Sequence, residues 1–322
     1  MNPDVIPLFS DVMALRPVAG MPGHYDGNLN ADWTIGPKPH GGVMIALCAK
    51  AAREAYALDG RAAHPVAVSA NYLSAPDPGP VRLVTTVRKR GRRIGLVDVE
   101  LVQGERASGG QERSDSGIRQ GGQERSDSGI RQGGQERSDP GIRQGGQERS
   151  DPGRTCVRAV VTLGKPEHDA RPLFSRNPVT ALMDLEPPAD LLPIGPGHPA
   201  AEINNLARGC DIRPLVVESV SDGVAPTFRI WVRPKVGPVD ELFALMCGDI
   251  SLPVPYAVGR RGWAPTVQLT AYLRGLPADG WLRVVCTTTE IGEDWFDEDH
   301  TVVDSAGRIV VQTRQLALVP AG

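Results

Sequence analysis

The stretch DELFALMCGDISLP (residues 240–253) and the stretch WAPTVQLTAYL (residues 263–273) decide the fold. In the first, Leu242, Leu245 and Met246 recur at the spacing of one helix face, and Asp249 extends the series to i+7. The pattern therefore predicts a helix that carries a carboxylate on its apolar face. Burial penalises a charged carboxylate unless the group is hydrogen-bonded or takes part in chemistry. Asp249 is accordingly the first candidate site residue.

The second stretch alternates between polar and apolar side chains, as a half-buried strand does. Its polar positions are Thr266, Gln268, Thr270 and Tyr272, and its apolar positions are Val267, Leu269, Ala271 and Leu273. An acid on a helix, followed closely by a strand with hydroxyl and amide side chains, predicts a polar site built from both elements.

The length and charge of the chain limit the classes of protein to which it can belong. The chain has 322 residues, enough for two domains with cores of their own. Its 35 basic and 38 acidic residues nearly balance, which disfavours nucleic acid or a membrane surface as a partner. No apolar run approaches the roughly 20 residues of a membrane-spanning helix, and the first residues lack a secretory-signal pattern. We expect a cytoplasmic protein without a membrane span.

The five cysteines are scattered along the chain and form no C-x-x-C pair. An odd number without close pairs argues against a disulfide framework and against a structural zinc site. Cys48 and Cys247 fall within apolar helical patterns, where a thiol packs as a small hydrophobic group.

A second helix is predicted from about Gly41 to Leu58, where prolines and a glycine pair precede a run rich in Ala, Leu, Met and Lys. The pair Gly41-Gly42 leaves backbone N–H groups open to an acceptor that approaches closely. Simple steric needs of the loop would explain the pair equally well. Runs rich in Val and Thr predict strands at His64–Ala75, Pro80–Arg90, Arg93–Gly104 and Thr155–Leu163.

A tandem repeat interrupts these strands. The unit GGQERSDSGIRQ occurs from residues 109 and 121, a third copy from 133 carries Pro140 in place of Ser, and a shortened fourth copy ends at 153. Each full unit has balanced charges and one isoleucine, so it cannot bury enough apolar surface to offset the entropy of ordering. We predict that residues 107–153 are a disordered insertion in a hairpin turn, which costs only about 2 kcal/mol of loop-closure entropy. Binding of a partner by the repeats is the alternative.

The second half of the chain repeats the order of the first. Residues 165–200 are dense in proline and predict a linker with one short helix near Val179–Leu185. Strand patterns return on both sides of the helix predicted within residues 240–253, at residues 207–220, 226–233, 281–290, 300–304 and 308–319.

The halves also match in sequence, which indicates an internal duplication. VMIALCAK (43–50) lies over LFALMCGD (242–249), PVAVSANYL (65–73) over PTVQLTAYL (265–273), and VRAVVTL (157–163) over TRQLALV (313–319). In this alignment three polar residues of the second half match residues of a different type in the first: Asp249 is aligned with Lys50, Thr266 with Val66 and Gln315 with Ala159. A helix-end Asp, a strand Thr and an edge Gln are each ordinary. Their joint asymmetry favours a site built in one half only.

These features resemble the type II acyl-CoA thioesterases. The resemblance rests on the helix that starts at the pair Gly41-Gly42, the Asp of GDISLP, the strand PTVQLTAYL and the final strand VQTRQL. It covers nearly the whole chain except the repeat and the linker. It implies an α+β double hotdog fold, in which two antiparallel sheets each wrap around a long central helix. The domains implied are residues 1–164 and 201–322, with the linker 165–200 between them.

The resemblance assigns the family's Asp, Thr and Gln to Asp249, Thr266 and Gln315, and it implies hydrolysis of an acyl-CoA thioester without a metal or organic cofactor. Asp249 would act as a general base or orient the attacking water, which Thr266 and Gln315 would hold. Amides near Gly41 and Gly42 are candidates to stabilise the oxyanion. Direct attack by Asp249, through an anhydride, stays open as the alternative route.

Basic side chains in loops are candidate contacts for the phosphates of coenzyme A: Arg90, Arg92, Arg93, Arg260 and Arg261. Two other functions stay open. A hotdog hydratase or dehydratase usually pairs its acid with a histidine a few residues later, and residues 250–258 contain none. A non-catalytic protein that binds acyl thioesters or serves as a scaffold is the other. A homo-oligomer is compatible with all of these functions.

Deletion of residues 109–153 is expected to leave thioester hydrolysis within about twofold of the full chain, because a neutral insertion in a hairpin turn adds little to the folded structure. The measurement is thiol release from acyl-CoA by the full chain and by the deletion variant. A collapse of the rate in a variant that still folds would show that the repeats have a role.

Overall fold

The computed structural model describes residues 5–57, 63–104, 153–167, 171–217 and 226–321. The predicted insertion at 107–153 lies outside these ranges apart from Gly153, and its predicted disorder stays a prediction.

Strands make up most of the regular secondary structure of the described residues. They are β1 (Arg16–Pro17), β2 (His24–Leu29), β3 (Thr34–Ile35), β4 (Lys38–Pro39), β5 (His64–Tyr72), β6 (Gly79–Arg90), β7 (Gly95–Gln103), β8 (Arg154–Gly164), β9 (Cys210–Val217), β10 (Thr227–Pro234), β11 (Thr266–Leu273), β12 (Leu282–Thr287), β13 (Trp295–Val303) and β14 (Ile309–Leu318). The helices are α1 (Phe9–Val12), α2 (Gly41–Ala57), α3 (Val179–Leu182) and α4 (Glu241–Cys247), with 3-10 turns η1 (Ala31–Trp33), η2 (Asn205–Arg208) and η3 (Val254–Val258).

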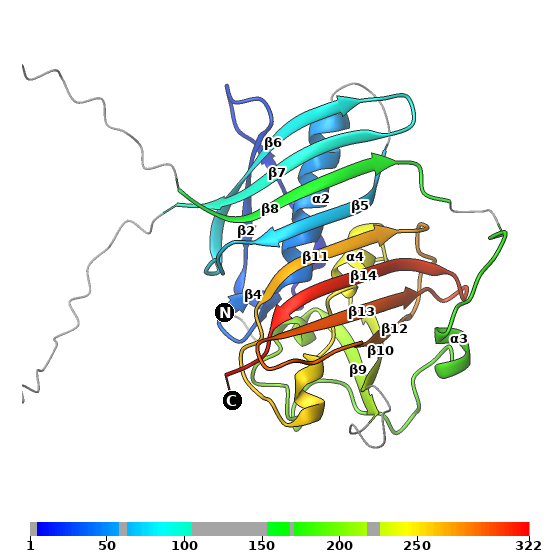
Figure 1. Cartoon of the computed structure of the whole chain (residues 1–322). Helices are drawn as coiled ribbons and strands as arrows, with labels where there is room; N and C mark the ends of the chain where they lie inside the picture. The colour runs from blue at the N-terminus through cyan, green and yellow to red at the C-terminus, as the bar shows by residue number, and fades with distance from the viewer. Residues whose placement is uncertain (1–4, 58–62, 105–152, 168–170, 218–225, 322) are drawn as a thin grey trace, which may run out of the picture. The chain divides into compact units, whose positions relative to one another are not determined.

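All of these strands except β3 and β4 form one antiparallel sheet of 12 strands, in the order β1-β2-β6-β7-β8-β5-β11-β14-β13-β12-β10-β9 (Figure 1). At its centre β5 of the first half pairs with β11 of the second, for example at Ala70 and Leu269. The prediction of two separate sheets is therefore wrong. Pairing of β5 with β11 satisfies the backbone N–H and C=O groups that two separate sheets would leave open at their edges.

The strand order supports the internal duplication. Outward from the seam between β5 and β11, the first half runs β5, β8, β7, β6, β2 and the second runs β11, β14, β13, β12, β10. In both halves the strand that follows the main helix lies at the seam, and the last strand of that half lies next to it. Because both halves share this sheet within one compact unit, the domain boundaries at residues 164 and 201 stay predictions.

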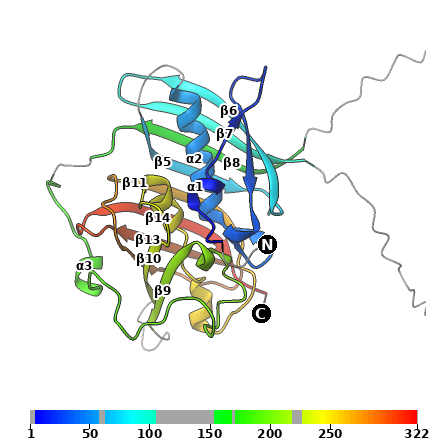
Figure 2. The same ribbon diagram turned by 180° about the vertical axis from the view of Figure 1, so that it is seen from behind.

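The helices α2 and α4 pack against each other on one face of the sheet (Figure 2). α2 begins at Gly41, as predicted, and most of its side chains are buried because the sheet and α4 cover them. Among the described residues of the second half there is no helix of matching length, since α4 spans only 7 residues. The predicted long central helix is therefore found in the first half and is wrong for the second.

α4 ends two residues before Asp249, so the prediction that this carboxylate projects from a helix is wrong. The predicted correspondence between Asp249 and Lys50 is wrong too, because Lys50 lies within α2 whereas Asp249 follows the end of α4. Gly248, a poor helix former, stands at the C-cap. The amide of Asp249 bonds to the carbonyl oxygen of Met246 at 3.1 Å, a tightened last turn that ends the helix.

The overlay of the two central strands shifts by one residue. The register of β5 slips at Val66, and that of β11 slips at Val267, so equivalent positions differ by 267 − 66 = 201 residues rather than 200. Thr266 thus corresponds to Pro65, and the predicted counterpart Val66 is wrong. The buried residues agree with this register, because Val68 and Leu269 both face the core.

The same register also changes which residue of the first half corresponds to Gln315. Gln315 pairs with Leu269, and Val161 pairs with the equivalent Val68. The predicted counterpart Ala159 is therefore wrong by two residues. The asymmetry itself remains, because a buried amide in the second half takes the place of the fully buried Val161 in the first.

The described part of the linker packs on the second half. Helix α3 lies within the predicted span 179–185, and Val179 and Met183 join a buried cluster with Trp231. The indole N–H of Trp231 donates to the carbonyl oxygen of Asp184 at 2.9 Å. The linker thus covers an apolar patch of the second half instead of only spanning a distance.

Phe243→Ala is expected to lower the free energy of unfolding by about 3–5 kcal/mol, because it opens a cavity where the halves meet. Phe243 on α4 is fully buried, and its ring lies 5.4 Å from that of Phe9, edge to face. Denaturant unfolding measures the change. Phe174→Ala, at a ring that is 83% exposed, is the control and should change stability by a few tenths of a kcal/mol. Equal effects of the two substitutions would contradict this account of the packing.

Candidate active site

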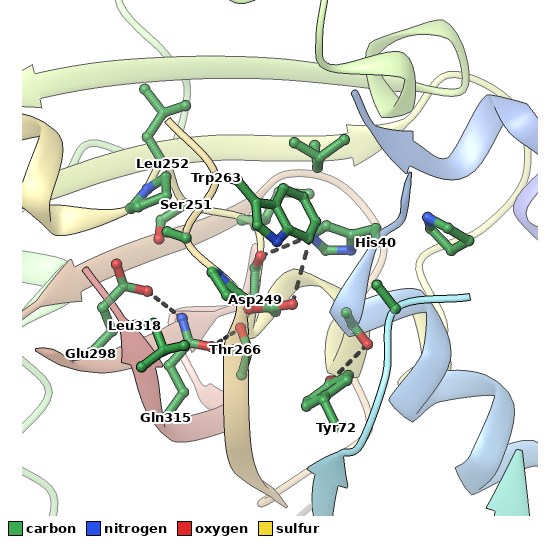
Figure 3. A pocket seen from close by; sticks show the side chains of 18 of the residues that line it. His40, Tyr72, Asp249, Ser251, Leu252, Trp263, Thr266, Glu298, Gln315 and Leu318 are labelled. Carbon is green, nitrogen blue, oxygen red and sulfur yellow. Dashed lines mark hydrogen bonds and ion pairs between the residues drawn. The ribbon is translucent and has the colours of Figure 1, made fainter. Parts of the chain in front are cut away.

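A pocket of about 350 Å³ lies at the seam between the halves (Figure 3). Its polar wall comes from both halves and includes His40, Gly41, Tyr72, Asp249, Ser251, Thr266, Glu298 and Gln315. The three predicted site residues Asp249, Thr266 and Gln315 therefore share one cavity.

Asp249 lies against the N-terminal end of α2, and its side chain is only 9% exposed. Burial raises the pKa of Asp249 above its usual range, while His40 and the backbone amide of Gly42 oppose that shift. The carboxylate is therefore a stronger base than an exposed aspartate, and the amide of Gly42 still stabilises its charged form.

Gly41 and Gly42 allow this close approach. A Cβ at Gly41 would collide with the carboxylate of Asp249, and one at Gly42 would collide with the carbonyl oxygen of Met246. The carbonyl oxygen of Gly41 accepts a hydrogen bond from the hydroxyl of Tyr72 at 2.9 Å. The role of these amides at an oxyanion stays a prediction, and the amide of Gly42 already has the carboxylate of Asp249 as its acceptor.

His40 is a site residue that the sequence analysis did not place. It precedes α2, is 6% exposed, and its Nε2 lies 2.8 Å from the backbone oxygen of Asp249 and 3.8 Å from Oδ2. Its Nδ1 is buried and has no hydrogen-bond partner among the residues that the structure describes. No local pattern could have paired the two residues, because 209 positions separate them.

Thr266 on β11 and Gln315 on β14 contact each other directly. The hydroxyl of Thr266 donates to Oε1 of Gln315 at 2.9 Å. Gln315 is 6% exposed, so its amide is held inside the protein and can reach only the pocket and its immediate neighbours. Figure 3 shows this pair facing the same space as Asp249.

Glu298 on β13 is a second site residue that the sequence analysis missed. It pairs with Gln315 across the strands, is 1% exposed, and its Oε2 accepts a hydrogen bond from Nε2 of Gln315. Its Oε1 accepts one from the amide of Val254 at 2.7 Å. Burial raises the pKa of Glu298 to about 8, although these two hydrogen bonds oppose the shift. The signal was present in the alternation of β13, but the strand predicted at 300–304 began too late to include it.

Glu298 belongs to a buried cluster of three side chains that are able to bind metals. The cluster consists of Cys286, Glu298 and His300, and one potential ligand atom from each lies within 4.8 Å of the other two. The contacts favour a hydrogen-bonded core, because both oxygens of Glu298 accept N–H groups and Nε2 of His300 lies 2.8 Å from Oγ of Ser251. Burial raises the pKa of Cys286 well above its usual range, which disfavours the thiolate that a metal requires.

The predicted phosphate-binding arginines lie in two places. Arg90 stacks 5.5 Å from the ring of Tyr56, near the C-terminal end of α2, and the two arginines at 92 and 93 follow it in the same hairpin. A helix of 17 residues is about 25 Å long, so these groups are distant from the pocket at its other end. Arg260 and Arg261 are exposed and adjoin Trp263, which lines the pocket. The structure therefore favours the second pair.

Models of two protein domains match this chain, one in each half. A model of the acyl-CoA thioesterase N-terminal domain matches residues 29–112, and one of the C-terminal domain matches residues 187–319. Uncharacterized proteins from Mycobacterium tuberculosis H37Rv and Mycobacterium bovis are each 50% identical over 335 residues, which cover 98% of this chain and 99% of each relative. The chain belongs to the acyl-CoA thioesterase family.

Solved structures show that this thioesterase-family chain has the hotdog fold. A hot dog protein of unknown function from Alicyclobacillus acidocaldarius superposes with a TM-score of 0.66 at 18% identity, covering 98% of both chains. An acyl-CoA thioesterase II from Mycobacterium marinum superposes with a TM-score of 0.61 at 13% identity, covering 98% of this chain and 99% of the other. At these identities the likeness concerns the fold alone. Within the described residues, no helix is both long and apolar enough to cross a membrane.

The free energy of unfolding of this thioesterase-family protein is expected to fall as the pH rises from about 4.5 to about 8. In that range Glu298 is ionised in the unfolded chain but protonated in the folded one, so its contribution to stability is lost with rising pH. The shift corresponds to roughly 4–5 kcal/mol. Denaturant unfolding of wild type and Glu298→Gln at pH 5 and pH 8 measures it.

Glu298→Gln should flatten the dependence of stability on pH, because an amide does not titrate. Glu202→Gln, at an exposed glutamate, is the matched control and should keep the wild-type dependence. The same steep decrease in Glu298→Gln would show that Glu298 does not hold its proton in the folded state.

Proposed function

We propose that the protein hydrolyses acyl-CoA thioesters to a free fatty acid and CoA. One observation carries the proposal: Asp249, Thr266 and Gln315 line a single pocket, with the hydroxyl of Thr266 bonded to Gln315. A carboxylate, a hydroxyl and an amide around one space can hold a water molecule by several hydrogen bonds and fix its line of attack. Membership of the acyl-CoA thioesterase family agrees with this chemistry.

In the proposed reaction, the held water attacks the carbonyl carbon of the thioester. Asp249 accepts a proton from the water as the new C–O bond forms, and its raised pKa suits this role at neutral pH. The C–S bond then breaks, and the CoA thiolate leaves and takes up a proton. Attack by the carboxylate of Asp249 itself, which would give an anhydride that water then hydrolyses, is the alternative route. Neither route needs a metal or an organic cofactor.

The rest of the pocket suits an acyl chain. Apolar side chains from both halves line it, among them Ile35, Met44, Leu73, Ile203, Leu206, Leu252, Phe296 and Leu318. Burial of methylene groups against such a wall contributes about 0.8 kcal/mol each. We assign the CoA phosphates to the exposed Arg260 and Arg261 beside the pocket. Cytoplasmic location and assembly into a homo-oligomer stay predictions.

Hydration of a double bond is the second candidate function, and the contact between Asp249 and His40 favours it. The sequence left this chemistry open as an alternative, although no histidine follows Asp249 closely. The first half now supplies an imidazole 3.8 Å from the carboxylate. An acid and an imidazole on one wall could add water across the double bond of an enoyl thioester. Hydrolysis is preferred because hydration gives no role to the pair Thr266 and Gln315.

Asp249→Asn is expected to lower kcat for thioester hydrolysis by about a hundredfold or more, because the amide cannot accept the proton of water. In wild type the rate should fall as the pH falls through the pKa of Asp249, which lies above the ordinary value of 3.8. Thiol release, followed across acyl-CoA substrates of different chain length, measures both effects.

Asp190→Asn, at an exposed aspartate of the linker, is the control and should leave kcat unchanged. No thiol release by wild type on any substrate would favour a non-catalytic binding protein. Loss of absorbance from an enoyl-CoA without thiol release would favour the hydratase. An Asp249→Asn variant that keeps the wild-type rate would overturn the proposed role of this residue.

A further inference from the structure

We propose that Glu298 is a positioning residue: its carboxyl group fixes the orientation of the Gln315 side-chain amide and thereby decides which hydrogen-bonding role Thr266 takes towards the attacking water. The inference rests on the proposed hydrolysis and adds to it a buried residue outside the Asp, Thr and Gln set.

The two ends of a side-chain amide are opposite in character, since the NH₂ group donates and the oxygen accepts. Glu298 and Gln315 face each other across β13 and β14, and Nε2 of Gln315 donates to Oε2 of Glu298. This contact turns Oε1 of Gln315 towards Thr266, whose hydroxyl donates to it at 2.9 Å. The oxygen of Thr266 then keeps its lone pairs free to accept a hydrogen from water.

The reversed amide would undo this arrangement. Its oxygen would face a carboxylate oxygen of Glu298, and two acceptors that face each other repel, at a cost that is high where water is excluded. Its NH₂ group would donate to Thr266, which would then turn its own hydrogen into the pocket. An ionised Glu298 therefore selects one of the two orientations of Gln315.

Glu298 is itself held firmly enough to do this. It is 1% exposed, and its second oxygen accepts the amide of Val254 at 2.7 Å. Val254 begins the turn η3, only five residues after Asp249. The contact thus ties the pair of strands that carries Gln315 to the segment that carries the proposed base.

The charge of Glu298 makes its effect measurable. Burial raises the pKa of Glu298 to about 8, and Asp249 and Asp297 add to the shift. Of the groups packed against it, Cys286 has a pKa well above its usual range, and His300 has one lowered to about 3 by burial, so both stay neutral between pH 5 and 9. Only the ionised carboxylate enforces the orientation of Gln315, since a neutral carboxyl group can also donate.

Five variants and a pH profile test the proposal on the full chain, with thiol release from acyl-CoA as the assay. Wild type should show a rise in kcat of a few-fold through about pH 8, in addition to the rise through the pKa of Asp249. Glu298→Leu should lower kcat roughly tenfold to a hundredfold with KM within about twofold, because a misplaced water costs rate rather than binding. Glu298→Gln has one oxygen for the two N–H donors of Val254 and Gln315 and cannot ionise, so its kcat should stay near the lower wild-type value found well below pH 8, and the rise near pH 8 should disappear.

Asp299→Asn changes an acid on the same strand that pairs with Arg314, away from the pocket, and it should keep the wild-type profile. Glu298→Leu combined with Gln315→Ala should be no slower than Gln315→Ala alone, because Glu298 acts through Gln315. Multiplied losses in this double variant, or a rise near pH 8 that persists in Glu298→Gln, would overturn the proposal. If Glu298→Leu does not fold, Glu298→Gln and the pH profile decide alone. Failure of hydrolysis by wild type would instead overturn the proposed function.

Discussion

Antiparallel pairing of β5 with β11 is the constraint on which the rest of the structure depends. It joins the two halves into one sheet and leaves α2 and α4 packed side by side on the same face. The N-terminal end of α2 then meets the segment that follows α4, and the glycine pair allows contact with Asp249. A site with its acid from one half and its imidazole from the other exists only because this seam closes.

Burial is the common cause of the unusual acids at the site. Asp249 and Glu298 both have raised pKa values because water is excluded, and in both cases backbone amides oppose the shift. The difference between the two lies in their partners. Asp249 faces the pocket beside His40, whereas both oxygens of Glu298 are taken by Val254 and Gln315. The carboxylate of Asp249 thus lines the pocket, and that of Glu298 holds a neighbour in place.

Much of the fold could be predicted because the patterns are local. The alternation around Leu269 and Ala271 predicted a strand with those side chains buried, and they are. The start of α2 at Gly41 was confirmed for the same reason. The overlay of the two central strands was wrong by one residue because bulges at Val66 and Val267 leave no mark in an ungapped match. The end of α4 was wrong because the apolar spacing continues past Gly248, where the backbone turns.

The sequence by itself determined most of the strands, the main helix, the duplication and the family, and with the family it predicted the set Asp249, Thr266 and Gln315, which the structure brings to one pocket. These follow from side-chain periodicity and from short motifs, which neighbouring residues control. Only the tertiary structure decided that the sheet is continuous, that His40 lies beside Asp249, and that Glu298 holds Gln315. Such contacts depend on strand register and helix packing between distant segments, and no local pattern encodes which buried polar groups will meet.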